Sequence, residues 1–164
     1  MGSRIWSIDA ILKNVAANTS LDPTNCLLIA ELQRNARLSL AELGRRVGLS
    51  PPAVAERLQR LEQNGTITGY HAEVDPRAVG LALSAIIRIR PSPGQVQNVA
   101  ELARETPEVV ECHRVTGDDC YIMRAHLRDV LHLEEVIDRF TVLGQTTTQV
   151  MQSSPVPGRP LEVS

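Results

Sequence analysis

The sequence predicts an α+β protein that joins an N-terminal helix-turn-helix module, of the winged-helix-like kind, to a C-terminal ferredoxin-like βαββαβ module. The first observation is that residues 39–62 contain two short amphipathic helical segments separated by a tight turn. The second is that helical periodicity gives way to short β-rich segments after Gly65. Their order, β-α-β-β-α-β, is that of a four-stranded antiparallel sheet with both helices on one face.

Changes in composition, together with proline and glycine positions, divide the chain into five segments. We expect an N-terminal extension at 1–20, a helix-turn-helix module at 21–65, a strand and hinge linker at 66–80, a ferredoxin-like module at 81–153 and a tail at 154–164. Within the extension, Ile5, Ile8, Leu12 and Val15 recur at roughly helical spacing and predict a short helix.

A bracing helix is expected to open the helix-turn-helix module. It would begin at Pro23 with Asp22 as its N-cap, and it would end near Asn35. Its expected apolar face comprises Cys26, Leu27, Ile29, Ala30 and Leu32.

The two segments within 39–62 each have one apolar face and one start signal. The faces comprise Leu40, Leu43 and Val47 in the first segment and Val54, Leu58 and Leu61 in the second. Ser39 followed by Glu42 fits a capping box, and Ser50 followed by Pro51 fits an N-cap with proline in the first turn. Gly48 stands where the first helix must end with positive φ, which gives the spacing of a helix-turn-helix.

The outward side of the second helix is the expected DNA-contact surface. Arginine can fork onto guanine or a phosphate, glutamine can pair with adenine, and a small alanine can meet a thymine methyl group. The candidate residues are Ser39, Ser50, Pro52, Ala53, Glu56, Arg57, Gln59 and Arg60. A second interpretation stays open here, because charged residues on a small helical bundle also face water without contacting DNA.

Composition limits the class of protein. The chain has 164 residues, is 43% hydrophobic and carries a formal net charge of −2, which excludes a strongly basic, non-specific nucleic-acid binder. Residues 21–66 hold six arginines against five carboxylates, so high DNA affinity would require two modules paired in a dimer. The sequence has no membrane-length apolar run, no signal-peptide core and no CxxC motif. We therefore expect a cytoplasmic protein with reduced thiols and no membrane partner.

The C-terminal module is expected to contain four strands and two helices. The strands are predicted at 83–90, 109–116, 120–127 and 146–152, and the helices at 95–105 and 129–143. A further strand is predicted at 66–74, in the linker. Apolar residues run almost continuously through 84–89, which predicts that the sheet face away from the helices packs on another subunit.

The chain resembles the leucine-responsive/asparagine-operon regulators, the Lrp/AsnC or feast/famine family. The resemblance covers about residues 21–153 and rests on LDPTNCLLIAELQRNARLSLAELGRRVGLSPPAVAERLQRLEQNGTITGY with VDPRAVG, on PEVVECHRVTGDDCY and on the last strand. It implies a transcriptional regulator whose N-terminal module binds double-stranded DNA. It also implies a ferredoxin-like domain that dimerises through its sheets, assembles further into a tetramer or an octamer of dimers, and binds a small effector, usually an amino acid, between dimers.

The resemblance places an effector site at the turn between the second and third strands of that domain. The family pattern G-x-x-D-Y appears here as Gly117-Asp118-Asp119-Cys120-Tyr121, with Cys120 where the family has Asp. The expected effector residues are Thr116, Gly117, Asp118, Asp119, Cys120, Tyr121, Thr146 and Thr148. Two alternatives stay open: an ordinary Asp/Gly hairpin, and a ligand-independent regulator that organises DNA.

Two other functions receive less support from the residues. A metal- or thiol-responsive regulator would use Cys112, His113, Cys120 and His126, but adjacent strand residues face opposite ways and no CxxC or HxxxH pair is present. An enzyme would require a nucleophile elbow, a phosphate loop or paired acidic residues, and the sequence shows none of these motifs. We therefore expect no catalysis, no resident metal and no cofactor other than the effector.

Overall fold

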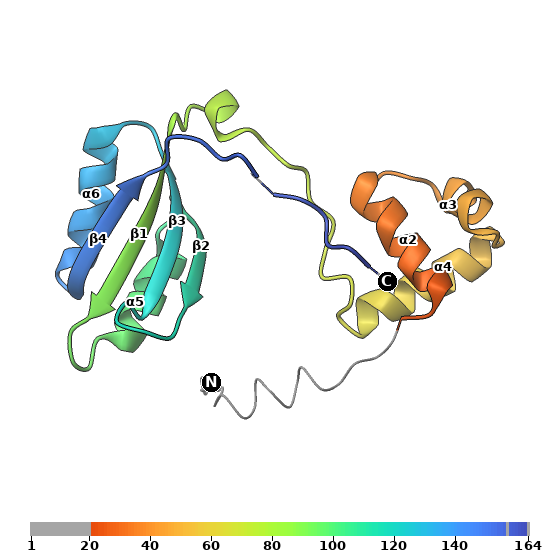
Figure 1. The fold of residues 1–164 in the computed structure, drawn as a ribbon, viewed down its shortest axis with the longest axis horizontal. Coiled ribbons are helices and arrows are strands. Elements are labelled where there is room, and N and C mark those ends of the chain that lie inside the picture. Colours follow the sequence, from red (N-terminus) through yellow and green to blue (C-terminus); the bar gives the residue numbers. More distant parts are fainter. Residues whose placement is uncertain (1–20, 157, 164) are drawn as a thin grey trace. The chain divides into compact units, whose positions relative to one another are not determined.

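The computed structural model describes residues 21–156 and 158–163, so the helix expected near Ile5 lies outside the described residues. The chain forms two compact units (Figure 1). The first contains the described residues up to His71 together with 158–163, and the second contains those from Ala72 onwards to the tail. None of the helices in this part of the chain combines the length and the apolar character needed to cross a membrane.

The first unit is a three-helix module with one small core. Its helices are α2 (Pro23–Arg34), α3 (Leu40–Val47) and α4 (Pro51–Gln63). The core comprises Leu28, Leu32, Leu43, Val54, Leu58 and Leu61. The predicted apolar face of α2 is corrected in one respect: Leu28 is fully buried, whereas Leu27 is 55% exposed. Compared with the predicted face, α2 is rotated about its axis. Leu28 and Leu32, four residues apart, both face α3 and α4.

Side-chain caps and one glycine define the helix ends of this unit. The Asn25 amide donates to Asp22 Oδ1 (2.8 Å), and the Glu42 amide donates to Ser39 Oγ (3.2 Å). The capping box is only half formed, because the Glu42 carboxylate pairs with arginines of its own helix instead of the Ser39 amide. Gly48 ends α3 with φ 74°, as predicted. Ser50 occupies the N-cap position of α4, but its side chain makes no capping hydrogen bond.

Gly44, in the middle of α3, permits the close approach of the turn. The Leu49 amide donates to the Gly44 carbonyl (2.9 Å), and this bond draws the turn back over the helix. A Cβ atom at Gly44 would lie 2.4 Å from the Leu49 carbonyl oxygen, well inside van der Waals contact. The sequence interpretation did not single out this residue, although a glycine inside a short helix is itself a signal of close packing.

The prediction of a strand at 66–74 is wrong, because the structure has no strand in this segment. A strand needs a hydrogen-bonding neighbour, and none pairs with this segment among the described residues. The segment is instead attached to α4 by the Ile67 amide, which donates to the Leu61 carbonyl (2.9 Å), and by the Tyr70 hydroxyl, which donates to Glu62 Oε1 (2.8 Å). Partial burial and then this carboxylate raise the pKa of Tyr70 to about 12.

The second unit has the predicted ferredoxin-like fold. After the short helix η1 (Pro76–Val79), the elements are β1 (Leu83–Pro91), α5 (Val96–Glu105), β2 (Val109–Arg114), β3 (Tyr121–Leu127), α6 (Val130–Thr141) and β4 (Gly144–Val150). The four strands form an antiparallel sheet in the order β2-β3-β1-β4, and α5 and α6 cover one face (Figure 1). β2 and β4 each end two residues earlier than predicted, and β4 also begins two residues earlier.

The two faces of the sheet differ in chemistry. The helix-covered face contributes Ala85, Ile87, Ile89, Met123, Ala125 and Leu127 to the core, with Val99, Val136 and Phe140 from the helices. We call the other side the open face; its β1 and β3 residues are Ser84, Ile86, Arg88, Arg90, Ile122, Arg124 and His126. The apolar run expected at 84–89 divides between the two faces, and only the two isoleucines of this set are apolar.

A partly buried polar cluster fixes the start of β2 against α6. Glu108 Oε1 lies 2.8 Å from His132 Nε2 and 3.2 Å from Arg139 Nη2. Burial by itself raises the pKa of Glu108, but hydrogen bonds from its own amide, His132 and Arg139 outweigh that effect, and the net pKa is lowered. The His132 amide donates to Asp129 Oδ1 (2.8 Å), so the same cluster includes the predicted N-cap of α6.

We predict that Gly44→Ala destabilises the first unit by about 1 to 3 kcal/mol, because the added methyl group must displace the Leu49 carbonyl. Helix propensity alone predicts the opposite sign, a gain of up to about 1 kcal/mol. Chemical denaturation followed by circular dichroism measures the change. Ala41→Gly, at an exposed position of α3, is the control and should cost about 1 kcal/mol through propensity. A stabilised Gly44→Ala protein would contradict the close approach.

Candidate functional site

The outward side of α4 is a continuous polar surface. Pro52, Glu56, Gln59 and Arg60 are exposed on the side of the helix opposite its buried Val54, Leu58 and Leu61. Arg60 Nη2 lies 2.5 Å from Glu56 Oε1, one helical turn away, and both side chains are largely exposed. A surface pair of this kind contributes at most about 1 kcal/mol, so DNA could displace the glutamate at little cost.

Arg57 is less exposed than these residues and has partners within the module. Its guanidinium lies 2.5 Å from Asp22 Oδ2 and 3.0 Å from Asn25 Oδ1, at the N-terminus of α2. The hydrogen bond from Arg57, followed by the amide of Asn25, lowers the pKa of the Asp22 carboxyl. Arg57 therefore braces α4 against α2. The sequence placed it off the buried face, but only the packing showed its partner.

The start of α4 has few free backbone donors. Because Pro51 and Pro52 have no N–H group, Ala53 supplies the only free amide of the first turn, and Pro52 can contact DNA only through its ring or its carbonyl. Ser50 keeps its hydroxyl free of any capping bond. Ser39 uses its own hydroxyl to cap α3.

The loop between β2 and β3 carries the predicted Gly-Asp-Asp turn. The Val115 amide donates to the Cys120 carbonyl (2.9 Å) and closes the loop, and Gly117 has φ 115°. Two arginines of β1 hold the carboxylates of this loop. Arg90 lies 3.3 Å from Asp118, and Arg88 lies 3.3 Å from Asp119. Thr116, Gly117 and Asp118 are exposed.

The remaining predicted effector residues point elsewhere. Tyr121 is only 5% exposed, and its hydroxyl donates to the Val96 carbonyl (3.0 Å) at the start of α5. Cys120 packs against the core. Thr146 and Thr148 pair with Ile89 and Ile87, so they lie on the helix-covered side of β4, and β1 separates them from the loop. Within one chain, the predicted effector residues do not form a single pocket.

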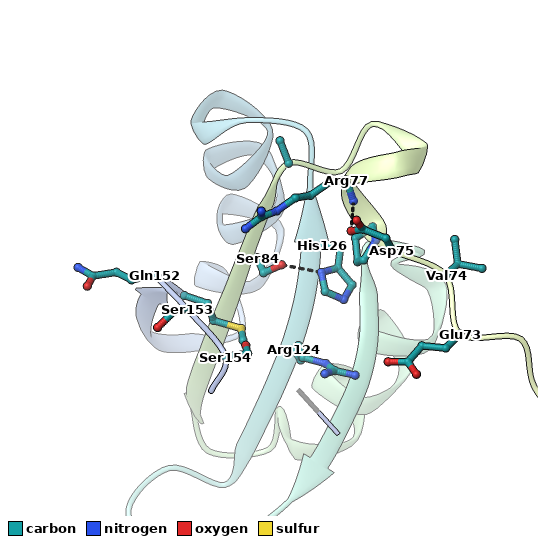
Figure 2. A pocket seen from close by; sticks show the side chains of 13 residues that line it. Glu73, Val74, Asp75, Arg77, Ser84, Arg124, His126, Gln152, Ser153 and Ser154 are labelled. Atoms are coloured by element: carbon teal, nitrogen blue, oxygen red, sulfur yellow. Dashed lines mark hydrogen bonds between the residues drawn. The ribbon is translucent and has the colours of Figure 1, made fainter. Parts of the chain in front are cut away.

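The structure adds a polar cavity that the sequence interpretation missed. It lies at one end of the open face, where Ser84, Arg124 and His126 meet the linker at Glu73 (Figure 2). Ser84 Oγ and His126 Nδ1 are 2.8 Å apart. The available signal was the alternation of Arg124 and His126 along one strand, which places both side chains on one face. The connection to the linker depends on chain folding that no local pattern encodes.

The residues considered for metal binding are spread across the second unit. Cys112 lies opposite Met123, His113 lies opposite Ile122, Cys120 packs on the core and His126 binds Ser84. Partial burial of the Cys112 thiol raises its pKa, and the charge of Arg104 opposes this effect. Among the described residues, no three His, Cys, Asp or Glu side chains are grouped so that they could hold a metal ion.

Comparison with known proteins matches both units. Residues 21–62 match the model of the AsnC-type helix-turn-helix domain, and residues 84–161 match that of the Lrp/AsnC ligand binding domain. The regulator YezC of Bacillus subtilis, described as an uncharacterised HTH-type transcriptional regulator, is 38% identical over 82% of this chain and 95% of its own length.

Two solved structures are similar over nearly their whole length. B. subtilis LrpC has a TM-score of 0.80 and 32% identity, covering 84% of this chain and 99% of LrpC. The feast or famine regulatory protein of Mycobacterium tuberculosis, solved in complex with L-methionine, has a TM-score of 0.81 and 31% identity, covering 86% and 98%. The helix-turn-helix geometry, the ferredoxin-like sheet and these matches agree. The chain belongs to the Lrp/AsnC family of DNA-binding helix-turn-helix transcriptional regulators.

Proposed function

We propose that the protein binds operator DNA by inserting α4 into the major groove and that an amino acid modulates this binding. The observation that supports DNA contact most directly is the one-sided polar face of α4. Gln59 and Arg60 supply the side chains that pair with adenine and guanine edges. The free hydroxyl of Ser50 and the amide of Ala53 are the groups available to hold a phosphate at the helix start.

We predict that Arg60→Ala weakens binding to the DNA upstream of the protein's own gene by about 1 to 3 kcal/mol and relaxes base preference at one position of each half-site. Fluorescence anisotropy at two salt concentrations measures both effects. Arg34→Ala is the matched control, because it removes an equally exposed arginine from α2 and should leave base preference unchanged. Equal losses in the two variants would indicate a general charge effect in place of direct base contact.

We also propose that the second unit assembles the protein into dimers and then into a tetramer or an octamer of dimers. The open face supports this proposal. Ile86 and Ile122 are only partly buried there, and Arg88 Nε is buried without an acceptor among the described residues. An unsatisfied buried donor costs about 1 to 3 kcal/mol, which a carboxylate or carbonyl of a second copy would recover.

Static light scattering of the wild type should give a mass of at least twice 18.0 kDa. Ile122→Asp should shift this mass toward the monomer, because it places a charge in the proposed contact. Val142→Asp, at a residue that is 77% exposed beyond α6, should leave the mass unchanged. A wild-type mass near 18.0 kDa at micromolar concentration would contradict the assembly.

We place the amino-acid effector at the β2–β3 loop, between dimers. The match to a ligand-binding domain and the methionine complex of the M. tuberculosis relative support an amino-acid effector. The exposed Gly117 with its neighbouring carboxylates supports this location. Because Asp118 and Thr146 lie on different parts of one chain, a site that uses both requires a second copy. The alternative function is a ligand-independent regulator that organises DNA, and it differs in binding no amino acid.

In a calorimetric screen of the twenty amino acids, we expect binding to the wild type and a lower amount bound per chain for Gly117→Arg, whose side chain fills the loop. Gly65→Arg is the control for backbone strain, since Gly65 also has positive φ and open space but lies after α4. It should bind as the wild type does. The absence of binding to the wild type would support the ligand-independent alternative, and equal binding by Gly117→Arg would remove the loop from the site.

A further inference from the structure

After the sheet, the chain returns to the first unit and lies in a groove of that unit. Residues 158–163 group with the three helices and not with the sheet that precedes them in the sequence. We call these residues the docked segment. The groove that holds it is formed by Leu21, the C-terminal half of α2, the loop after that helix and residues 66–71. The sequence predicts only a tail here, so the groove is a feature of the tertiary structure.

One glutamine side chain holds the docked segment by its backbone. The Leu161 amide donates to Gln33 Oε1 (2.8 Å), and Gln33 Nε2 donates to the Leu161 carbonyl (3.0 Å). The side-chain amide of Gln33 therefore pairs with both backbone groups of a single residue, as a residue of a neighbouring strand would. These bonds do not require the Leu161 side chain, which is 81% exposed.

The groove has an apolar surface, but the docked segment does not fill it. Its apolar lining includes Ile29, Leu32, Ile67 and Tyr70. A volume of about 780 Å³ remains beside the docked segment, of which only Val163 is partly buried. Exposed hydrogen bonds and a small buried area contribute little net free energy, so the docked and released states lie close in free energy. The segment can therefore be released without unfolding the unit.

The linker leaves the first unit along the same groove. Residues 66–71 line the groove, and hydrogen bonds from Ile67 and Tyr70 attach them to α4. In the second unit, the linker residues 73–77 and the residues 151–154 after β4 line one cavity (Figure 2). The outgoing and the returning chain therefore meet within each unit, and the chain passes between the units twice.

The composition of the returning chain favours docking. Residues 155–160 contain three prolines, and proline-rich chain is a semi-rigid spacer that loses less conformational entropy on docking than a flexible one. The described lining of the groove comes from Leu21, α2, the loop after it, 66–71 and 161–163, and does not include α4. The docked segment can thus restrain the first unit without covering its expected DNA-contact surface.

We propose that the groove is a docking site for the chain's own segment 158–163, and that docking forms a releasable second tether between the two units. In the docked state, a non-covalent strap holds the first unit in addition to the linker and narrows the range of positions that this unit samples. Release leaves the linker alone to hold it. The strap requires neither DNA nor an effector. Under the proposed function, it would limit the half-site spacings that two DNA-binding units can reach.

Methyl NMR of the full chain tests the docking, because it reports side-chain motion in large assemblies. The Val163 methyl signals should be broad in the wild type and about tenfold more intense in Gln33→Ala, which removes both hydrogen bonds. Leu161→Pro lacks the donated amide and should also release the segment, whereas Leu161→Ala should keep it docked. Gln97→Ala, at an exposed glutamine of α5, is the control for Gln33→Ala. Deletion of 158–164 identifies the Val163 signals.

The same spectra measure the tether. In the wild type, the methyl groups of Ile29 in the first unit and Ile87 in the second should relax at similar rates. In Gln33→Ala and Leu161→Pro, Ile29 should relax about twofold more slowly, because the first unit then moves more independently of the second. Circular dichroism should show equal helix content in all variants.

Sharp Val163 signals in the wild type, or unchanged signals in Gln33→Ala or Leu161→Pro, would overturn the docking. Docking without a change in Ile29 relaxation would overturn the tether. Labelled wild-type chains assembled with an excess of unlabelled Gln33→Ala chains should keep broad Val163 signals. Sharp signals in that mixture would assign the docked segment to a second copy and overturn the same-chain strap. The spectra involve neither DNA nor an amino acid, so failure of the strap and failure of the proposed function are distinguishable.

Discussion

The pleat of β1 is the constraint on which the second unit depends. This strand pairs with β3 on one side and β4 on the other, so the register fixes the face of the sheet on which each of its side chains lies. Ala85, Ile87 and Ile89 are completely buried beneath the helices, and Ile86 and Arg88 between them lie on the open face. Gly144 begins β4 so close to the Arg90 carbonyl that a Cβ atom would lie 2.2 Å from it. The core, the polar cavity at Ser84 and the positions of Arg88 and Arg90 beside the β2–β3 loop therefore follow from one register.

The first unit depends on caps and ion pairs, because its hydrophobic core is small. Arg57 connects α4 to the N-terminus of α2, and Arg46 connects α3 to Glu31 of α2. These arginines are used within the module. Fewer arginines therefore remain for phosphate contact than the sequence suggests. A weakly basic module gains DNA affinity mainly when two such modules bind together. Paired modules are consistent with the proposed assembly of the second unit.

Ligand chemistry and DNA contact are carried by different units, so regulation requires a connection between them. An effector changes DNA affinity only by its different affinity for two arrangements of the protein, and couplings of about 1 to 3 kcal/mol are typical. The linker is the direct covalent connection, and its residues Glu73 to Arg77 line the cavity on the open face.

The sequence by itself determined the helix-turn-helix, the βαββαβ order and most helix ends, because caps, glycine turns and apolar periodicity act over a few residues. It also located the second helix of the motif, α4, and the loop that contains Gly117. Tertiary structure decided what local patterns do not encode. The alternating segment 66–74 is not a strand because it has no pairing neighbour, and Arg57 is a brace because Asp22 lies beside it. Likewise, Ser84, Arg124 and Glu73 share one cavity only because segments distant in the chain are brought together by strand pairing and the return of the linker.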